Sequence, residues 1–338
     1  MKKTLLFTAF LGLAMAASAE HFKVIAPLPA EAEGLMAKLV DFDSGNAIDS
    51  VVVKDKCARF EGAVDDDILA RVQVDGVRTP VFILEPGTIS FNETEGAFGT
   101  MLNDQFRKLN KDIAAIMQGA REAGTDEAAK QAYAKYEAML DSTMNANTDN
   151  ALGYFIFLNG KAQQMDAASL REAFKKYPSF ASHKRAQGIL AQAEKREATQ
   201  PGNKYVDFAV TQPDGKVVKL SDYVGNGKYT LVDFWASWCG PCIRQTRVLK
   251  EIQEQYKNDP RLQILGVAVW DKVEDTNRAI EQHKLTWPCI VDAQTIPTDI
   301  YGITGIPCIM LIGPDGTILS RDKQSDELKA DVNAALAK

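Results

Sequence analysis

Residues 232–242 read VDFWASWCGPC, and this stretch decides the fold of the C-terminal part of the chain. Just before the cysteines, residues 230–235 form an apolar run that predicts a buried strand. From Cys242 onward, apolar residues recur at helical spacing, which predicts that a helix begins there. Cys239 is therefore expected at a helix amino terminus, where free N–H groups and the helix dipole favour an anion. Such a position lowers the pKa of a thiol from about 8.5 towards neutrality and makes the thiol a nucleophile.

The two cysteines of this stretch have the spacing of a redox pair. Cys239 is predicted to attack a disulfide, and Cys242, which lies three residues further on, is predicted to be shielded and to resolve the mixed disulfide. A C-x-x-C sequence is otherwise a structural disulfide or one half of a zinc site. Because nothing nearby supplies two further ligands at a regular spacing, we predict no metal site.

Strand and helix signals alternate from Tyr205 to the end of the chain. Residues 262–270 form a nearly continuous apolar run that is typical of a buried parallel strand. Residues 308–312 and 317–320 flank a Gly-Pro-Asp-Gly turn, which indicates a hairpin, and residues 326–336 predict a terminal helix. The alternation predicts an α/β domain with a central mixed sheet and helices on both of its faces.

The stretch 232–242 resembles the active-site pattern of the thioredoxin superfamily almost residue for residue. Within that superfamily, the exported TlpA/ResA-type thiol–disulfide oxidoreductases are the most similar branch, as further matching segments indicate: residues 206–208, 214–216, 220–223, 301–307 and 313–316. The resemblance covers residues 203–338 and implies an α/β thioredoxin fold there. A weaker resemblance links the N-terminal region to a β-rich domain of unknown function that is often fused to such proteins in Gram-negative bacteria.

The resemblance also implies roles for individual residues. Asp233 matches a buried carboxylate that accepts the proton of Cys242, although a strand-end Asp that faces water is the alternative. Residues 265–269, on the next parallel strand, contain no Lys as basic partner for this carboxylate. Pro307 matches the cis-proline of the family, although a trans-proline at the start of an edge strand is the alternative. The residues expected to contact the substrate are Trp238, Gly240, Pro241, Ile306, through its backbone, and Pro307.

Three further cysteines have no clear role. Cys308 occupies a position where the family usually has Thr, and Cys289 begins an expected strand. These two are inert buried thiols, or form a second disulfide, or Cys308 exchanges with the active pair. Cys57 is expected to be a lone thiol in the β-rich region.

Composition divides the chain into four segments. Residues 1–19 have two Lys, an apolar run and an Ala-Ser-Ala end, which is typical of a signal peptide cleaved near Ala19, with a buried or amphipathic first helix as the alternative. Residues 20–97 predict a small antiparallel β domain, and residues 98–198 predict helices that end in a polar linker. Residues 203–338 form the thioredoxin-like segment. The net charge of −6 argues against nucleic-acid binding.

These observations predict a periplasmic oxidoreductase that exchanges the Cys239–Cys242 disulfide or dithiol with substrate proteins and needs no other cofactor. The Gly240-Pro241 pair matches reducing thioredoxins and favours a reductant, and the resemblance implies a membrane-linked thiol donor. The alternatives are a disulfide isomerase that forms a homodimer through the N-terminal region, a thiol peroxidase and a non-enzymatic binding protein. A peroxidase would have a Pro-x-x-x-Thr-x-x-Cys sequence, which this site lacks.

Overall fold

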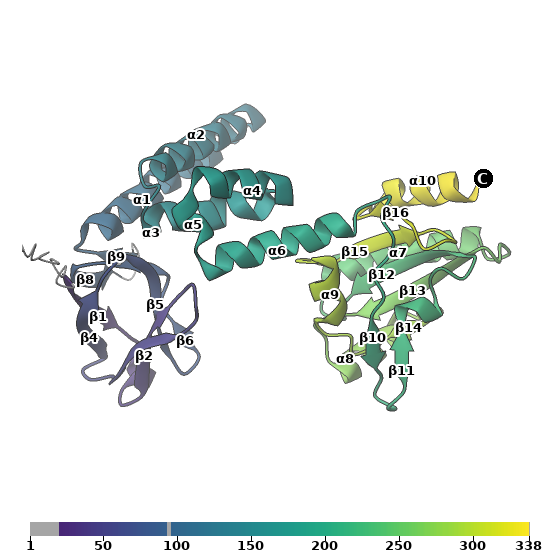
Figure 1. Cartoon of the computed structure of the whole chain (residues 1–338), viewed down its shortest axis with the longest axis horizontal. Coiled ribbons are helices and arrows are strands. Elements are labelled where there is room, and N and C mark those ends of the chain that lie inside the picture. The colour runs from purple at the N-terminus through teal and green to yellow at the C-terminus, as the bar shows by residue number, and fades with distance from the viewer. Residues whose placement is uncertain (1–19, 93–95, 338) are drawn as a thin grey trace, which may run out of the picture. The chain divides into compact units, whose positions relative to one another are not determined.

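The computed structural model of the chain describes residues 20–92 and 96–337 (Figure 1). The predicted signal peptide, residues 1–19, lies outside the described residues. By its internal contacts the chain divides into two units. The N-terminal unit contains the described residues up to Gln163 together with Tyr177–Ala186, and the C-terminal unit contains Gln164–Lys176 and the chain from Gln187 onward. The boundaries predicted from composition at residues 97, 198 and 203 stay predictions.

The N-terminal unit contains two small sheets that share one apolar core. Its strands are β1 (Glu20–Pro27), β2 (Met36–Asp41), β3 (Ala47–Val52), β4 (Cys57–Val64), β5 (Ile68–Val74), β6 (Val77–Arg78), β7 (Phe82–Leu84), β8 (Gly87–Asn92) and β9 (Gly96–Phe98). One sheet has the order β4-β1-β8-β9, and the other has the order β3-β2-β5-β6 with β7 paired to β5. The expectation of an antiparallel domain is wrong in one place, because β1 and β8 pair in parallel. Sequence patterns give strands but not which distant strands pair.

Helices follow the strands in the N-terminal unit. They are α1 (Met101–Ala123), α2 (Asp126–Asn145), α3 (Ala151–Ile156), which continues as a π-helical turn, and α5 (Pro178–Ala181). The buried carboxylate of Glu85, just after β7, caps α1, since it accepts hydrogen bonds from the backbone N–H groups of Leu102 at 2.9 Å and Asn103 at 3.0 Å. A carboxylate at this place satisfies free N–H groups and complements the helix dipole.

The C-terminal unit is built on a five-stranded mixed sheet of order β14-β13-β12-β15-β16. Its strands are β10 (Ala209–Thr211), β11 (Val217–Lys219), β12 (Tyr229–Trp235), β13 (Leu262–Ala268), β14 (Cys289–Ile290), β15 (Cys308–Ile312) and β16 (Ile318–Arg321). Its helices are α4 (Ala167–Lys176), α7 (Gly240–Gln255), α8 (Val273–Gln282), α9 (Ile296–Tyr301), α10 (Ser325–Leu336) and most of α6 (Lys184–Ala198). Strands β12, β13 and β14 are parallel, and β15 and β16 are antiparallel to their neighbours. This is the predicted α/β thioredoxin fold.

Helices cover both faces of this sheet. Successive residues of a strand point to opposite faces, so neighbouring residues of β12 pack against different helices. Leu231 on β12 packs with residues of α7 and α10. Val232 and Phe234 point the other way and pack with Tyr301 of α9 and with β10. The face beneath α7 is the one that carries the redox pair.

Thr199, which lies in the polar linker predicted at residues 194–203, packs within the C-terminal unit. Thr199 is completely buried, and its hydroxyl bonds to the carbonyl oxygen of Tyr301 at 3.2 Å. The buried guanidinium of Arg321 donates to Thr199 and, at 2.9 Å, to the carbonyl oxygen of Tyr301. Thr199 is thus fixed by buried hydrogen bonds, whereas residues 201–203, which follow it, are exposed.

Candidate active site

Cys239 and Cys242 are joined by a disulfide at the start of α7, with their Cα atoms 5.2 Å apart. Cys239 occupies the N-cap position, and its Sγ accepts a hydrogen bond from the backbone N–H of Cys242 at 3.1 Å. Pro241 follows in the first turn, where its missing N–H is not needed. This arrangement favours negative charge on the Cys239 sulfur, because an N–H donor and the positive end of the helix dipole both face it.

Both sulfurs lie in an apolar cluster beneath the protein surface. Cys239 is only 4% exposed and Cys242 is completely buried, and both pack with Trp235 and Ala279. The expected shielding of Cys242 is present, and Cys239 is also more enclosed than a bare C-x-x-C motif suggests. The two residues between them, Gly240 and Pro241, are exposed.

Asp233 lies near the end of β12 and is buried rather than facing water. Its Oδ1 atom has no hydrogen-bond partner. Loss of hydration raises the pKa of this carboxyl from 3.8 to about 7, because burial disfavours the charged form. Asp233 and Trp235 are two residues apart and so point to the same face, where Trp235 contacts the redox cluster. The burial predicted for Asp233 is present, and its role as the acceptor of the Cys242 proton stays a prediction.

The loop before β15 brings a second backbone segment to the redox pair. The Ile306–Pro307 peptide bond is cis, as predicted. The carbonyl oxygen of Ile306 lies 3.8 Å from the Sγ atom of Cys239, and the Ile306 side chain packs against the cluster of the two cysteines. A polypeptide that extends past Cys239 would therefore meet this backbone.

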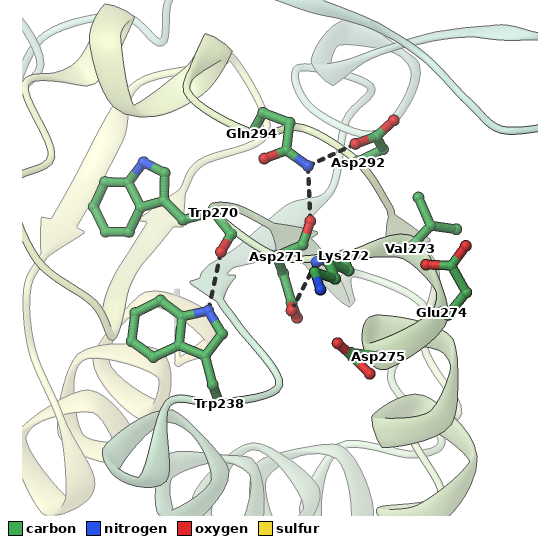
Figure 2. Close-up of a pocket in the computed structure, with 9 residues that line it drawn as sticks. All are labelled: Trp238, Trp270, Asp271, Lys272, Val273, Glu274, Asp275, Asp292 and Gln294. Carbon is green, nitrogen blue, oxygen red and sulfur yellow. Dashed lines mark hydrogen bonds between the residues drawn. The ribbon is translucent and has the colours of Figure 1, made fainter. Parts of the chain in front are cut away.

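The Trp238 indole is 62% exposed beside Cys239 and is the largest apolar surface there. Its N–H donates to the carbonyl oxygen of Trp270 at 3.0 Å, as Figure 2 shows. This contact borders a pocket of about 440 Å³ that is lined by Trp238, Trp270, Asp271, Lys272, Val273, Glu274, Asp275, Asp292 and Gln294. In Figure 2 the carboxylates of Glu274 and Asp275 lie across the pocket from the Trp238 indole.

Asp271 holds the loop that precedes Cys239. Its carboxylate accepts hydrogen bonds from the backbone N–H of Ser237 at 2.6 Å and from the Ser237 hydroxyl at 2.9 Å. It also accepts from the backbone of Lys272 and the hydroxyl of Thr276, each at 2.9 Å. Asp271 is not among the site residues predicted from the sequence, although it lies three residues after the end of β13, where open α/β sheets gather their site residues.

The three other cysteines are free thiols. Cys289 pairs in register with Gly266, on the face of the sheet that carries Asp233. Cys308 pairs with Phe234 and therefore points to the opposite face. The sheet separates these two sulfurs, so the suggested second disulfide between them is absent. Burial raises the pKa of Cys289 to about 12 and that of Cys308 well above its ordinary value, which disfavours the reactive thiolate form of both.

Among residues 20–92 and 96–337, no group of three or more His, Cys, Asp or Glu side chains is arranged to hold a metal ion. Within the same residues, no helix has both the length and the apolar composition that crossing a bilayer requires.

The part of this chain that is similar to known proteins lies in the C-terminal unit. Residues 201–321 match the model of the AhpC/TSA family. The thiol-disulfide oxidoreductase ResA of Geobacillus kaustophilus is 30% identical over 123 residues, which are 36% of this chain and 69% of the relative. ResA of Bacillus cereus (strain ATCC 10987) is 27% identical over 137 residues, which are 40% of this chain and 76% of the relative.

Solved structures are similar to this chain over about the same part of its length as these relatives. The crystal structure of a putative thiol:disulfide interchange protein DsbE from Chlorobium tepidum is 31% identical, with a TM-score of 0.37, and the match covers 40% of this chain and 98% of that one.

Proposed function

Because this chain belongs to the ResA-type thiol–disulfide oxidoreductases of the thioredoxin-like superfamily, we propose that it reduces disulfides of substrate proteins in the periplasm. The observation that carries the proposal is the Cys239–Cys242 disulfide at the start of α7, with the Ile306 backbone beside it. The sequence of residues 1–19 supports export.

The reaction begins from the dithiol. The Cys239 thiolate attacks one sulfur of a substrate disulfide, a mixed disulfide forms, and the other substrate sulfur leaves as a thiolate that takes up a proton. Cys242 then loses its proton to the Asp233 carboxylate and attacks Cys239. The Cys239–Cys242 disulfide forms, the second substrate sulfur is released, and two electrons have passed to the substrate. A membrane-linked thiol donor returns the disulfide to the dithiol.

Substrate binding uses the surface around Cys239. The backbone of Ile306 pairs with an extended segment of the substrate, and the exposed Trp238 indole covers apolar parts of it. Gly240 has no side chain and the ring of Pro241 is compact, so the substrate backbone can approach the sulfur of Cys239.

The experiment compares thiol reactivity and trapping in the full chain. With the reduced protein at pH 7, Cys239 should react with iodoacetamide at least about tenfold faster than free cysteine, because a larger share of it is thiolate. Cys242→Ala should accumulate mixed disulfides with periplasmic proteins, whereas Cys239→Ala should accumulate none. Cys308→Ala is the matched control and should behave like the wild type. A Cys239 that reacts no faster than free cysteine contradicts the proposal.

The direction of electron flow depends on the reduction potential of the pair, since about 30 mV corresponds to only ~1.4 kcal/mol. A potential near that of reducing thioredoxins supports a reductant, and a potential close to that of oxidising enzymes contradicts it. The other candidates have their own tests. An isomerase would be a dimer that refolds a scrambled substrate, a peroxidase would consume peroxide with no added thioredoxin, and a binding protein would keep its function in Cys239→Ala.

A further inference from the structure

The pocket beside Trp238 borders the redox pair, and the reaction described above makes no use of it (Figure 2). Its volume is about 440 Å³, and its walls come from three segments of the C-terminal unit. They are Trp238, which directly precedes Cys239, then residues 270–275, which lead from the end of β13 into the first turn of α8, and the loop after β14. A polypeptide whose cysteine is joined to Cys239 therefore carries its neighbouring side chains past this pocket.

Three residues of the pocket walls, Trp270, Asp292 and Gln294, have positive φ values of +54°, +59° and +48°. This left-handed region is unfavourable for a side chain as large as that of Trp, and it persists only where surrounding contacts impose it. The carbonyl oxygen of Trp270 accepts a hydrogen bond from the Trp238 indole at 3.0 Å. The Gln294 amide donates to the carbonyl oxygen of Asp271 at 2.7 Å and to the Asp292 carboxylate at 2.6 Å. These contacts fix the walls of the pocket before a substrate binds.

The lining of the pocket is acidic, since four carboxylates and one Lys give it a formal charge of −3. Three of the carboxylates are engaged. Asp271 accepts the four hydrogen bonds described above, Asp292 accepts from the amide of Gln294, and Asp275 forms an ion pair with Arg278 at 3.1 Å. Glu274 is exposed, and among residues 20–92 and 96–337 its carboxylate has no hydrogen-bond or ion-pair partner. It is therefore the carboxylate that is available to a ligand.

We propose that the pocket binds a Lys or Arg side chain next to the cysteine of a substrate disulfide, so that Trp238 and Glu274 determine which disulfides the protein reduces. This inference rests on the proposed function and adds a substrate class to it. The methylene groups of a Lys or Arg side chain cover apolar surface, so they can lie against the exposed indole of Trp238. The charged end then reaches the Glu274 carboxylate, which lies across the pocket from the indole in Figure 2. An acidic side chain in the same place meets a lining of its own sign and is disfavoured.

The test compares the reduction of two substrates by the full chain. Each substrate is a disulfide-linked pair of identical short peptides, and the residues on both sides of the cysteine are Lys in one substrate and Glu in the other. Neighbouring charges also change the reactivity of the disulfide itself. The quantity compared between proteins is therefore the ratio of kcat/KM for the Lys substrate to kcat/KM for the Glu substrate. In Glu274→Gln we expect this ratio to fall about fivefold from the wild-type value, which is the upper range for an exposed ion pair.

The matched control is Glu281→Gln, which removes the same charge from an exposed position in the last turn of α8, outside the pocket. This variant should keep the wild-type ratio. An unchanged ratio in Glu274→Gln overturns the inference. An equal fall in both variants also overturns it, since the net charge and not the pocket would then select the substrate. A loss of folded protein lowers both kcat/KM values together and does not change their ratio.

A second measurement separates the inference from the proposed function. With Ser in place of the peptide cysteine no exchange occurs, and the indole N–H resonance of Trp238, assigned by its loss in Trp238→Phe, reports on binding alone. The Lys peptide should shift this resonance in the wild type and not in Glu274→Gln, and the Glu peptide should leave it in place. If the disulfide substrates are reduced with the same ratio by both proteins, the inference fails and the proposed function stands. If neither substrate is reduced and the resonance shifts as expected, the proposed function fails while the binding site stands.

Discussion

At the scale of single residues, Asp233 has the most distinctive chemistry of the described chain. Its carboxyl is buried, and burial raises its pKa to about 7. Replacing it with Asn keeps the size of the side chain and removes the group that we propose takes the proton of Cys242. We expect disulfide reduction at pH 7.5 to fall by about 100-fold, which is a common loss for a general base. Stopped-flow measurement of the release of substrate from the mixed disulfide tests this, and a pH profile in Asp233→Asn identical to the wild type contradicts it.

The same carboxyl also affects stability, and the sign follows from its raised pKa. The folded protein holds the proton up to about pH 7, whereas the unfolded chain releases it near pH 3.8. The favourable contribution is therefore complete below pH 3.8 and is lost as the pH rises to about 7. Because Asn cannot ionise, we expect Asp233→Asn to gain stability relative to the wild type, by roughly 3 kcal/mol more at pH 8 than at pH 5.

Urea unfolding followed by tryptophan fluorescence measures this effect in the intact chain. All four tryptophans, at positions 235, 238, 270 and 287, belong to the C-terminal unit, so the signal reports on that unit alone. A stability difference between variant and wild type that does not change with pH would show that Asp233 is ionised in the folded protein throughout this range.

At the scale of elements, Asp271 connects the loop after β12 to the start of α8. Four hydrogen bonds converge on its carboxylate, two of them from Ser237. Asp271→Ala leaves these donors unpaired in a buried place, and we expect the C-terminal unit to lose about 2–4 kcal/mol. Ser237→Ala removes a single hydroxyl and should cost about 1 kcal/mol. Equal unfolding midpoints for the two variants, measured by tryptophan fluorescence, would contradict this role of Asp271.

The contact between α6 and α9 depends on the absence of a side chain at Gly302. This residue ends α9 with a φ of +61°, and a Cβ atom there would lie 2.7 Å from the backbone N of Arg196 and would also collide with the backbone of Gln192. In Gly302→Ala, therefore, we expect α6 to move away and its amides at residues 187–198 to exchange hydrogen at least about tenfold faster.

The matched control is Gly188→Ala, on α6 itself. Nothing lies within 4 Å of a Cβ atom at Gly188, so this change should slow the exchange or leave it unaltered, since Ala favours the helix by about 1 kcal/mol over Gly. If both variants exchange like the wild type, the close approach of α6 and Gly302 is not required for docking.

At the scale of the whole molecule, export and processing are the properties to test. We expect the chain, expressed in a Gram-negative bacterium, to be recovered from the periplasm without residues 1–19. Cleavage there leaves β1 intact, because β1 begins at Glu20, which pairs with Val64. Mass spectrometry of the periplasmic fraction measures the new terminus. A full-length chain that stays in the cytoplasm would contradict the proposed location.

Features that depend on neighbouring residues could be predicted from the sequence. The strand, turn and helix around Cys239 follow from the sequence because their apolar spacing is local, and the helical character of residues 98–198 follows for the same reason. The α/β thioredoxin fold and the oxidoreductase class followed from residues 232–242 and their flanking segments, and both are confirmed. The roles of the individual site residues stay predictions.

Only the tertiary structure decided which distant residues meet. The row of Asp233, Gly266 and Cys289 depends on the register of three strands, and the separation of Cys289 from Cys308 depends on the face to which each points. The parallel pairing of β1 with β8 and the burial of Thr199 are likewise contacts between segments far apart in the chain. A shift of one residue in register would turn each side chain to the other face, and local sequence patterns do not determine that register between distant strands.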